Sequence, residues 1–377
     1  MLNLLPLVRL AAEQAQTRFV KKTQQIAAVQ EQFLWRLLRA YSGTVLGQEY
    51  HLHDIRTIEQ FQQRVPILPY SGYSSYIERI AAGEPNVLTP DPVVYLNKTS
   101  GSTGKYKLIP VTRRFQNSMG WANLTSIGFL SQALRSRGSR FGRGMVINQA
   151  IEPEVTTGGI EYGCAGPGVL RMGAGLYQQL FVHPFAALKP RDTLTRTYLC
   201  LLFALKNSPV GLAGNFPMVI LQTCKYLEDH AESLIHDLET GTLAAWLQLD
   251  PALRQSLTAQ LRPAPKQAQR LREILRSEGR LTPRTAWPTL AFYGTARGGT
   301  TDFYLERFPE YFGDTPGFGF LFTTAEGTFS IYPDLNTNGS VLAIETGFFE
   351  FIPMAEWEAE QPKTLLAHEV EAGQLYR

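Results

Sequence analysis

Short runs of β-branched and aromatic residues alternate with longer amphipathic stretches along this chain, and this alternation restricts the fold more than any other feature. The first such run covers residues 93–96, and a second covers residues 145–148. Four more follow late in the chain, at residues 290–293, 318–322, 329–332 and 348–352. Strands that alternate with helices are typical of an α/β fold with a largely parallel sheet. The sequence therefore predicts mostly parallel sheets flanked by helices, with the late strands forming a second sheet.

The helical segments are recognised by apolar residues that recur at helical spacing. The longest predicted helix covers residues 13–40, with Phe19, Ile26, Phe33 and Leu37 on one face. The other predicted helices cover residues 58–65, 72–82, 112–135, 191–206, 216–238 and 268–277. Residues 155–175 are rich in glycine, and we expect them to form a binding loop rather than a core element.

The composition excludes several classes of protein. A chain of 377 residues with 44% hydrophobic residues is long enough for a deep core. The 36 Lys and Arg residues are scattered and nearly balanced by 33 Asp and Glu, so no nucleic-acid partner is expected. The longest apolar run, residues 198–205, is too short to span a bilayer. Three widely spaced cysteines suit a reduced protein, and together these features predict a soluble, cytoplasmic protein.

The predicted strand at residues 93–96 leads into a loop in which hydroxyls and glycines alternate and lysines follow. Its candidate phosphate-binding residues are Ser100, Gly101, Ser102, Thr103, Gly104, Lys105 and Lys107. Glycines let backbone N–H groups converge on an anion, hydroxyls donate to phosphate oxygens, and lysine supplies the opposite charge. The loop differs from a Walker A motif, because Thr99 holds the first glycine position and Tyr106 follows the first lysine. The pattern favours a site for ATP or pyrophosphate over an ordinary Ser/Gly connection.

These residues resemble the phosphate loop of the adenylate-forming superfamily, the acyl-CoA synthetases, luciferases and their relatives, which reads T-S-G-S/T-T-G-K-P-K. Lys107 matches the recurring lysine of that superfamily, and Tyr106 replaces its usual proline. Residues 322–327 resemble its aromatic-Gly-x-Thr/Ser-Glu segment, which implies that Glu326 holds Mg²⁺. A solvent-facing loop glutamate is the alternative. Ala325 stands at the hydroxyl position, so a neighbouring threonine would have to serve. The candidates for nucleotide contact in this segment are Phe322, Thr323 and Thr324.

A narrower resemblance links the chain to the auxin-responsive acyl-acid amido synthetases, the Gretchen Hagen family of plants, which has bacterial relatives. Residues 348–354 resemble that family's Y-F-E-F-I-P-M segment, and residues 214–243 resemble its helix that ends in a S/T-G-T-L turn. Trp287-Pro288 followed by residues 293–299 resembles its W-P…G-S-M-G-Q segment, which lines the adenine and acid sites. This segment supplies the candidates Gly294, Thr295 and Arg297. Three segments in the family's order make the resemblance specific.

The resemblance implies an ATP- and Mg²⁺-dependent ligase with two half-reactions. A carboxylic acid and ATP give an acyl-adenylate and pyrophosphate, and the amine of an amino acid then displaces AMP. The acid is implied to lie near Thr157, Gly158 and Arg171. Arg171 would pair with the substrate carboxylate through two hydrogen bonds, and a plain surface arginine is the alternative. The sequence leaves the acid, the amine and the oligomeric state open.

The resemblance also implies that the chain is incomplete. Residues 1–377 correspond to the large N-terminal domain of the adenylate-forming fold, and the last residues match a strand that in the family continues into a G-L-Y-R-Y-x-x-G-D motif. That motif's aspartate holds the ribose, and a small mobile C-terminal domain follows it. We therefore expect weak nucleotide binding and no full ligase turnover from these residues alone. An acyl-CoA-forming ligase, sharing its loop with phenylacetate ligases, and a truncated, non-catalytic binding module are the alternatives.

Overall fold

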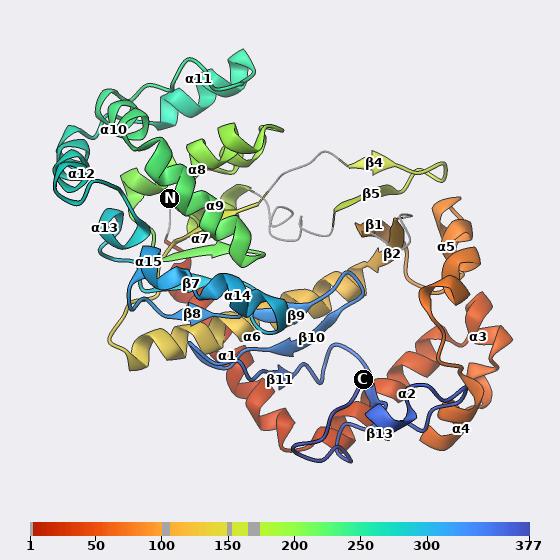
Figure 1. Ribbon diagram of the computed structural model, residues 1–377. Helices are drawn as coiled ribbons and strands as arrows, with labels where there is room; N and C mark the ends of the chain where they lie inside the picture. The colour runs from red at the N-terminus through yellow and green to blue at the C-terminus, as the bar shows by residue number, and fades with distance from the viewer. Residues whose placement is uncertain (1–2, 100–105, 149–152, 165–173) are drawn as a thin grey trace.

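The computed structural model of the protein describes residues 3–99, 106–148, 153–164 and 174–377 and shows a mixed α/β fold (Figure 1). Helices and short strands alternate as the sequence predicts, so the predicted fold class is confirmed. The α-helices are α1 (Leu5–Thr23), α2 (Ile26–Tyr41), α3 (Val45–Glu49), α4 (Ile58–Arg64), α5 (Ser74–Ala81), α6 (Arg113–Ser136), α7 (Ala174–Leu180), α8 (Thr193–Asn207), α9 (Pro217–Asp229), α10 (Ala231–Thr240), α11 (Pro251–Gln260), α12 (Pro265–Glu278), α13 (Pro283–Ala286), α14 (Asp302–Leu305) and α15 (Phe308–Phe312).

A four-stranded parallel sheet forms the centre of the fold. Its order is β3 (Gly144–Ile147), β6 (Gly211–Gly214), β7 (Phe292–Gly294) and β8 (Gly317–Phe318). Every neighbouring pair in this sheet is parallel, so the carboxyl ends of all four strands lie at one edge. Ligands of open α/β sheets bind at this edge, outside the carboxyl ends of the strands.

A second four-stranded sheet has the order β2 (Lys107–Thr112), β1 (Val93–Thr99), β5 (Glu161–Cys164) and β4 (Glu154–Val155). Strands β1 and β5 are parallel, and the other pairs are antiparallel. Figure 1 shows these strands beside α5 and apart from the group formed by helices α8 to α13. Pro110 lies in β2, an edge strand of the sheet, and edge strands are where sheets tolerate proline.

The late strands do not form the single second sheet that the sequence predicts: β7 and β8 join the central parallel sheet, and the strands after them form two smaller antiparallel sheets. One contains β9 (Leu321–Thr323), β10 (Thr328–Ile331) and β11 (Val341–Leu342), and the other pairs β12 (Glu350–Phe351) with β13 (Leu365–Leu366). The predicted strand at residues 318–322 is divided between β8 and β9 by Phe320, whose φ is +53°. This left-handed residue takes the chain from the parallel sheet into the antiparallel one.

The predicted helix at residues 13–40 is divided into α1 and α2 by a break at Gln25, which has φ −131° and ψ 41°. No glycine or proline marks the break; tertiary contacts explain it. Helix α1 packs along α6, whereas α2 contacts α3 and the segment between β11 and β12. There the buried Gln30 Nε2 donates to Ile344 O and Gly347 O, at 2.7 and 2.9 Å, and Gln30 Oε1 accepts from Phe349 N at 2.8 Å. The predicted helix at residues 216–238 is likewise divided, at His230, into α9 and α10.

The largest hydrophobic core surrounds α8, whose residues 198–202, 204 and 205 are fully buried. The apolar run of the sequence is thus an interior helix of the fold. Trp287 is 1% exposed in this core, and its Nε1 donates to Ala204 O at 3.1 Å. Among the described residues, no helix is both long and apolar enough to cross a membrane.

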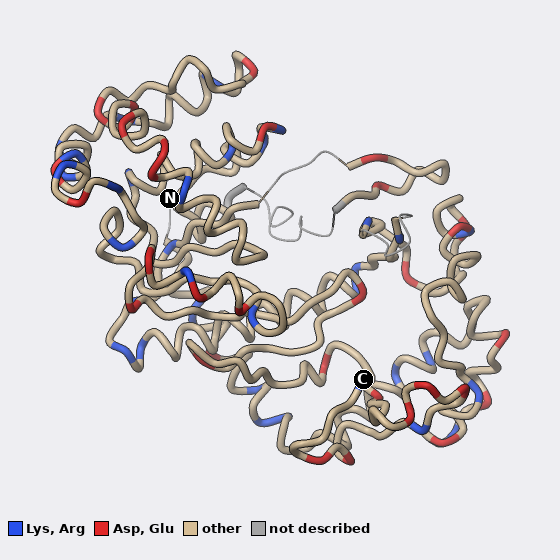
Figure 2. The backbone as a smooth tube through the Cα atoms, in the orientation of Figure 1, with Lys and Arg blue, Asp and Glu red and all other residues tan. Residues whose placement is uncertain are grey.

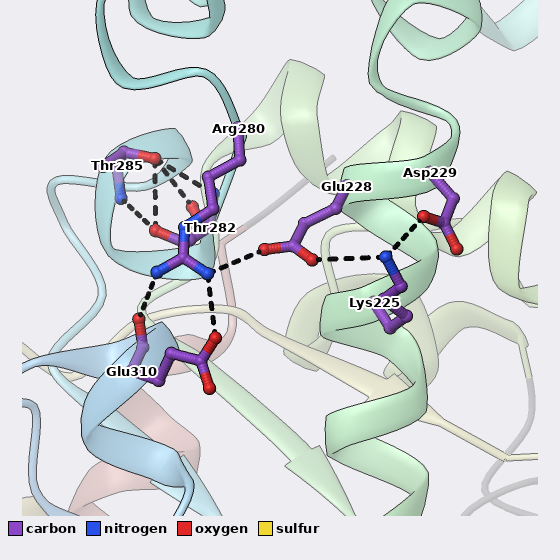
Figure 3. A network of polar contacts seen from close by, with 7 residues as sticks. All are labelled: Lys225, Glu228, Asp229, Arg280, Thr282, Thr285 and Glu310. Atoms are coloured by element: carbon purple, nitrogen blue, oxygen red, sulfur yellow. Dashed lines mark hydrogen bonds and ion pairs between the residues drawn. The ribbon is translucent and has the colours of Figure 1, made fainter.

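Charged side chains of both signs are mixed along the described chain and do not form a patch of one sign (Figure 2). Lysine and arginine are interspersed with aspartate and glutamate along the whole backbone (Figure 2). Figure 3 shows one network, in which Arg280 Nη1 contacts Glu228 Oε1 at 3.2 Å and Glu310 Oε1 at 2.9 Å. Because Glu228 and Glu310 lie on α9 and α15, the Arg280 guanidinium joins these two helices across the segment before α13.

Candidate functional site

The hairpin of β1 and β2 carries the predicted phosphate loop. Ser100, Gly101, Ser102, Thr103, Gly104 and Lys105 lie outside the described residues, and Thr99 and Lys107 face each other where the two strands diverge. Asn97 pairs with Ile109 and Lys98 with Leu108. Since side chains alternate across a strand, Asn97 and Lys107 project from one face of the sheet and Lys98 and Leu108 from the other.

The segment with Glu326 is the tight turn between β9 and β10. Thr323 pairs with Thr328, Thr324 N donates to Gly327 O at 2.9 Å, and Glu326 N donates to Thr324 Oγ1 at 3.2 Å. The Thr324 hydroxyl therefore holds the turn together. The Glu326 carboxylate is exposed and makes no hydrogen bond or ion pair with any described residue. Phe322, 54% exposed, and Thr323 are also exposed beside the turn.

Asn97 joins these two segments. Its Nδ2 donates to Ala325 O at 3.2 Å in a buried position, across 228 residues of sequence. Asn97 and Lys107 share a face of the hairpin, so this hydrogen bond places the turn of Glu326 on the same side of the sheet as Lys107. Asn97 was not among the residues predicted from the sequence, because the predicted strand ended before it. A polar amide directly after an apolar strand was the available signal.

Replacing Asn97 with alanine should lower ATP-dependent activity about tenfold, because an unpaired buried carbonyl costs about 1–3 kcal/mol and the turn of Glu326 would lose its anchor. Pyrophosphate exchange and the thermal midpoint would be measured together. Asn123→Ala is the matched control, since Asn123 Nδ2 also donates to a backbone carbonyl, Met119 O at 2.9 Å, but at an exposed position of α6. Equal effects of the two substitutions would contradict the anchoring role.

Gly294 and Thr295 lie at the carboxyl edge of the parallel sheet, as the end of β7 and the residue after it. Thr295 N donates to Phe318 O at 3.1 Å, and Ala296 N donates to Asn215 O at 3.4 Å, which ties together the ends of β6, β7 and β8. The Thr295 side chain is 3% exposed, and its Oγ1 has no hydrogen-bond partner among the described residues. A buried, unpaired hydroxyl at this edge is suited to a ligand.

The glycine at position 294 is required by Phe320. A Cβ at Gly294 would lie 2.1 Å from Phe320 Cε2, so only glycine allows the ring to pack against the end of β7. Phe320 is also the left-handed residue that leads from β8 into β9. The packing therefore fixes the path of the chain from the parallel sheet to the turn of Glu326.

Arg297 lies on the connection after β7 and is bound on several sides. Its Nε and Nη2 donate to Asn338 Oδ1 at 3.3 and 3.0 Å, and its carbonyl accepts from the Tyr332 hydroxyl at 2.9 Å. The remaining nitrogen, Nη1, is buried and has no partner among the described residues. The two N–H groups of this nitrogen are thus available to an anion.

Thr157 and Gly158 lie in the turn between β4 and β5, and Thr157 is exposed. Gly158 N donates to Ala81 O at 3.0 Å, and a Cβ at Gly158 would lie 2.2 Å from Gly83 N. The glycine therefore permits close packing of this turn against the end of α5, a structural role that the sequence did not predict. Part of the predicted binding loop is thus a β-hairpin, and Arg171 lies outside the described residues.

A magnesium ion fits the residues of this site only if the phosphates of a bound nucleotide supply most of its ligands. No group of three or more His, Cys, Asp or Glu side chains that could hold a metal occurs among the described residues. Magnesium is commonly held by one or two carboxylates together with substrate phosphates and water. The exposed, unpaired carboxylate of Glu326 fits that mode and not a metal site built from protein ligands alone.

Comparison with known proteins identifies relatives of this architecture. The model of the GH3 family N-terminal domain matches residues 15–317, and the model of the GH3 family central domain matches residues 340–377. Indole-3-acetic acid-amido synthetase GH3.10 of Arabidopsis thaliana is 27% identical over 339 residues, covering 84% of this chain and 56% of that protein. Jasmonoyl--L-amino acid synthetase JAR4 of Nicotiana attenuata is 23% identical over 396 residues, covering 97% of this chain and 65% of that protein.

The fold agrees with these sequence matches. The solved structure of GH3.15 acyl acid amido synthetase aligns with a TM-score of 0.83 at 21% sequence identity, covering 97% of this chain and 65% of the other. The chain thus spans between 56% and 65% of the length of these relatives. Because the N-terminal domain model alone extends over residues 15–317 of 377, the chain belongs to the GH3 family.

Proposed function

We propose that this chain binds Mg·ATP and a carboxylic acid and catalyses formation of an acyl-adenylate, the first half-reaction of an acid-amido synthetase. The observation that carries the proposal is the hydrogen bond from Asn97 to Ala325, which brings the turn of Glu326 to the face of the hairpin that bears Lys107. A lysine and a free carboxylate on one side of the predicted phosphate loop suit a nucleoside triphosphate and its metal ion.

The proposed step is attack by a carboxylate oxygen of the acid on the α-phosphorus of ATP. A new O–P bond forms, the bond to the β-phosphate oxygen breaks, and pyrophosphate leaves with that electron pair. Lys107 would stabilise negative charge on the phosphate oxygens, and Glu326 would hold Mg²⁺, which neutralises charge on the triphosphate when bound. In the proposed second half-reaction an amino acid's amine attacks the acyl carbon, AMP leaves, and the amine gives up a proton.

The remaining predicted residues are proposed to surround these groups. Gly294 and Thr295, at the carboxyl edge of the parallel sheet, would contact the nucleotide, with the unpaired Thr295 hydroxyl as a donor. Ser100, Gly101, Ser102, Thr103, Gly104 and Lys105 would contact the phosphates, and Phe322, Thr323 and Thr324 would line the nucleotide on the side of Glu326. Arg297, with Thr157, Gly158 and Arg171, would face the acid.

The substrates are proposed to be an organic acid and an amino acid, because the relatives are named as indole-3-acetic acid-amido and jasmonoyl amino acid synthetases. A second solved structure, AtGH3.15 in complex with 2,4-DB, matches with a TM-score of 0.80. We propose the cytoplasm as the compartment, where ATP is available and where Cys200 and Cys224, both free thiols here, stay reduced.

The test is calorimetric titration with Mg·ATP followed by acid-dependent exchange of labelled pyrophosphate into ATP, over a panel of aryl and indole acids. Binding and exchange with at least one acid are expected, and the responding acid defines the substrate class. Amino acids or coenzyme A are then added to the responding reaction: AMP release with one of them identifies an amide-forming or a thioester-forming enzyme, and exchange without AMP release is expected if these residues perform only the first half-reaction. A folded chain that neither binds Mg·ATP nor exchanges pyrophosphate would refute the proposal.

A further inference from the structure

The face of the β1–β2 hairpin opposite Lys107 carries a cluster of aromatic and charged side chains. Lys98 faces Leu108 across the hairpin, and Tyr106, two residues before Leu108, projects from the same face. In the neighbouring strands, Tyr162 of β5 pairs with Leu96 of β1 and with Glu154 of β4. The register thus brings side chains from β1, β5 and β4 to one side of the sheet, together with Tyr106, which directly precedes β2.

The side chains of this cluster are in mutual contact. The Tyr106 and Tyr162 rings are stacked, with centroids 6.5 Å apart and an interplanar angle of 16°. Lys98 Nζ lies 4.6 Å from the Tyr106 ring centroid and 5.4 Å from that of Tyr162. The same ammonium pairs with Glu154 Oε1 at 3.1 Å, and the Tyr162 hydroxyl donates to Glu154 Oε2 at 2.6 Å.

Each contact alone stabilises the cluster only modestly, but the same side chains take part in several contacts. Lys98 binds both rings and the carboxylate, and Glu154 binds both the ammonium and the phenol. The hydrogen bond from Tyr162, together with Lys98, lowers the pKa of Glu154, and the same hydrogen bond raises the pKa of Tyr162 to about 12. At neutral pH the carboxylate is therefore charged and the phenol keeps its proton. Connected networks of this kind hold a geometry that isolated surface pairs do not.

We propose that Lys98, Tyr106, Tyr162 and Glu154 form an aromatic latch that fixes the base of the phosphate loop, with Tyr106 as its positioning residue. The proposal rests on the proposed function, since the loop is assigned there to ATP. Tyr106 is the residue between the loop and β2, and it lies in the position that resembles the family's proline. A proline restricts the backbone through its ring, whereas this tyrosine is restrained by stacking on a neighbouring hairpin.

The latch acts on ATP through Lys107, which follows Tyr106 directly and begins β2. Holding Tyr106 in place fixes the backbone from which Lys107 projects before ATP binds, and such preorganisation reduces the entropy that binding costs. Tyr106 faces away from Lys107, so it does not need to touch the nucleotide. Its removal should therefore raise KM for ATP more than it lowers kcat.

The experiment compares Tyr106→Ala, Tyr106→Phe and Lys98→Met with the unsubstituted chain in two measurements. In pyrophosphate exchange with varied Mg·ATP, Tyr106→Ala and Lys98→Met should raise KM about threefold to tenfold, the size expected from losing stacking and cation–π contacts. Tyr106→Phe keeps the ring and should stay within about twofold of the parent, because no hydrogen bond of the Tyr106 hydroxyl is needed. Circular dichroism confirms that each variant is folded.

The second measurement is amide hydrogen exchange of residues 93–99 and 107–112 without ligand. Exchange should be faster in Tyr106→Ala and Lys98→Met and unchanged in Tyr106→Phe. Unchanged hydrogen exchange in Tyr106→Ala would overturn the latch, and faster hydrogen exchange with an unchanged KM would overturn its role in positioning Lys107. If the parent does not bind ATP, the proposed function fails and this role fails with it, while hydrogen exchange still tests the latch itself.

Discussion

Glu326→Ala and Lys107→Ala should each weaken Mg·ATP binding and lower acid-dependent pyrophosphate exchange by about 100-fold or more, while leaving the fold intact. Removing one preorganised electrostatic contact from a reacting centre typically costs a factor of about 10²–10³ in rate. Neither side chain supports the fold: the Glu326 carboxylate has no partner among the described residues, and Lys107 Nζ only lies over the Tyr70 ring, 5.2 Å from its centroid. Calorimetry, pyrophosphate exchange and thermal unfolding would be measured on the same samples.

Matched controls come from the same chain. Glu358 and Lys363 are exposed residues on the connection between β12 and β13, so Glu358→Ala and Lys363→Ala remove the same groups at a position with no assigned role. Both controls should stay within about twofold of the parent, as expected for surface substitutions. Unchanged affinity for Mg·ATP in both Glu326→Ala and Lys107→Ala would remove the phosphate-site assignment, whatever the controls show.

Trp287→Ala should lower the free energy of unfolding by about 3–5 kcal/mol, the usual cost of truncating a large buried aromatic side chain. The ring is 1% exposed against α8 in the main core, and its loss would leave a cavity there. The carbonyl of Ala204, which accepts from Trp287 Nε1, also accepts from Ser208 N at 2.9 Å, so it keeps a partner. The effect is therefore one of packing. The loss of stability would be measured by urea denaturation monitored by far-ultraviolet circular dichroism, which reports on the backbone rather than on tryptophan.

Two further substitutions test whether the loss of stability comes from the buried packing of Trp287 rather than from removing a tryptophan as such. Trp287→Phe keeps part of the ring and should cost less than Trp287→Ala. Trp121 is 59% exposed on α6, and Trp121→Ala should cost less than about 1 kcal/mol, because little surface is buried there. A loss at position 287 no larger than the loss at position 121 would contradict the central place of Trp287 in the core. These losses compare with a total stability of about 5–15 kcal/mol for a typical domain.

The sequence was informative wherever local chemistry decides structure. The strands near residues 93, 145, 292 and 328 are found where β-rich runs predict them, and α8 follows from its apolar run. The Thr112 side chain accepts from Phe115 N at the start of α6, at 3.2 Å, so that helix begins where a hydroxyl cap predicts it. In these places a residue and its near neighbours contain the whole signal.

The rest could not be predicted, because it depends on contacts between distant segments. The break between α1 and α2 places Gln30 against the connection between β11 and β12, and no local residue type marks it. The bond from Asn97 to Ala325 and the stacking of Tyr106 on Tyr162 likewise require the register of strands that the sequence leaves open. Gly158 was assigned to the acid through resemblance alone, and its packing against Gly83 emerges only from three-dimensional proximity.

The contacts of Gln30 set the order in which a nascent chain can complete its fold. Helix α2 leaves the ribosome long before the partners of the Gln30 amide, because Ile344, Gly347 and Phe349 lie more than 300 residues later in the chain. At a synthesis rate of about 5–20 residues per second, that interval is about 15–60 seconds. During it Leu34 and Leu38 lack the Phe348 side chain that completes their apolar cluster. Helix α2 is thus synthesised long before its packing can be completed, and its apolar face lacks this part of its native cover for that interval.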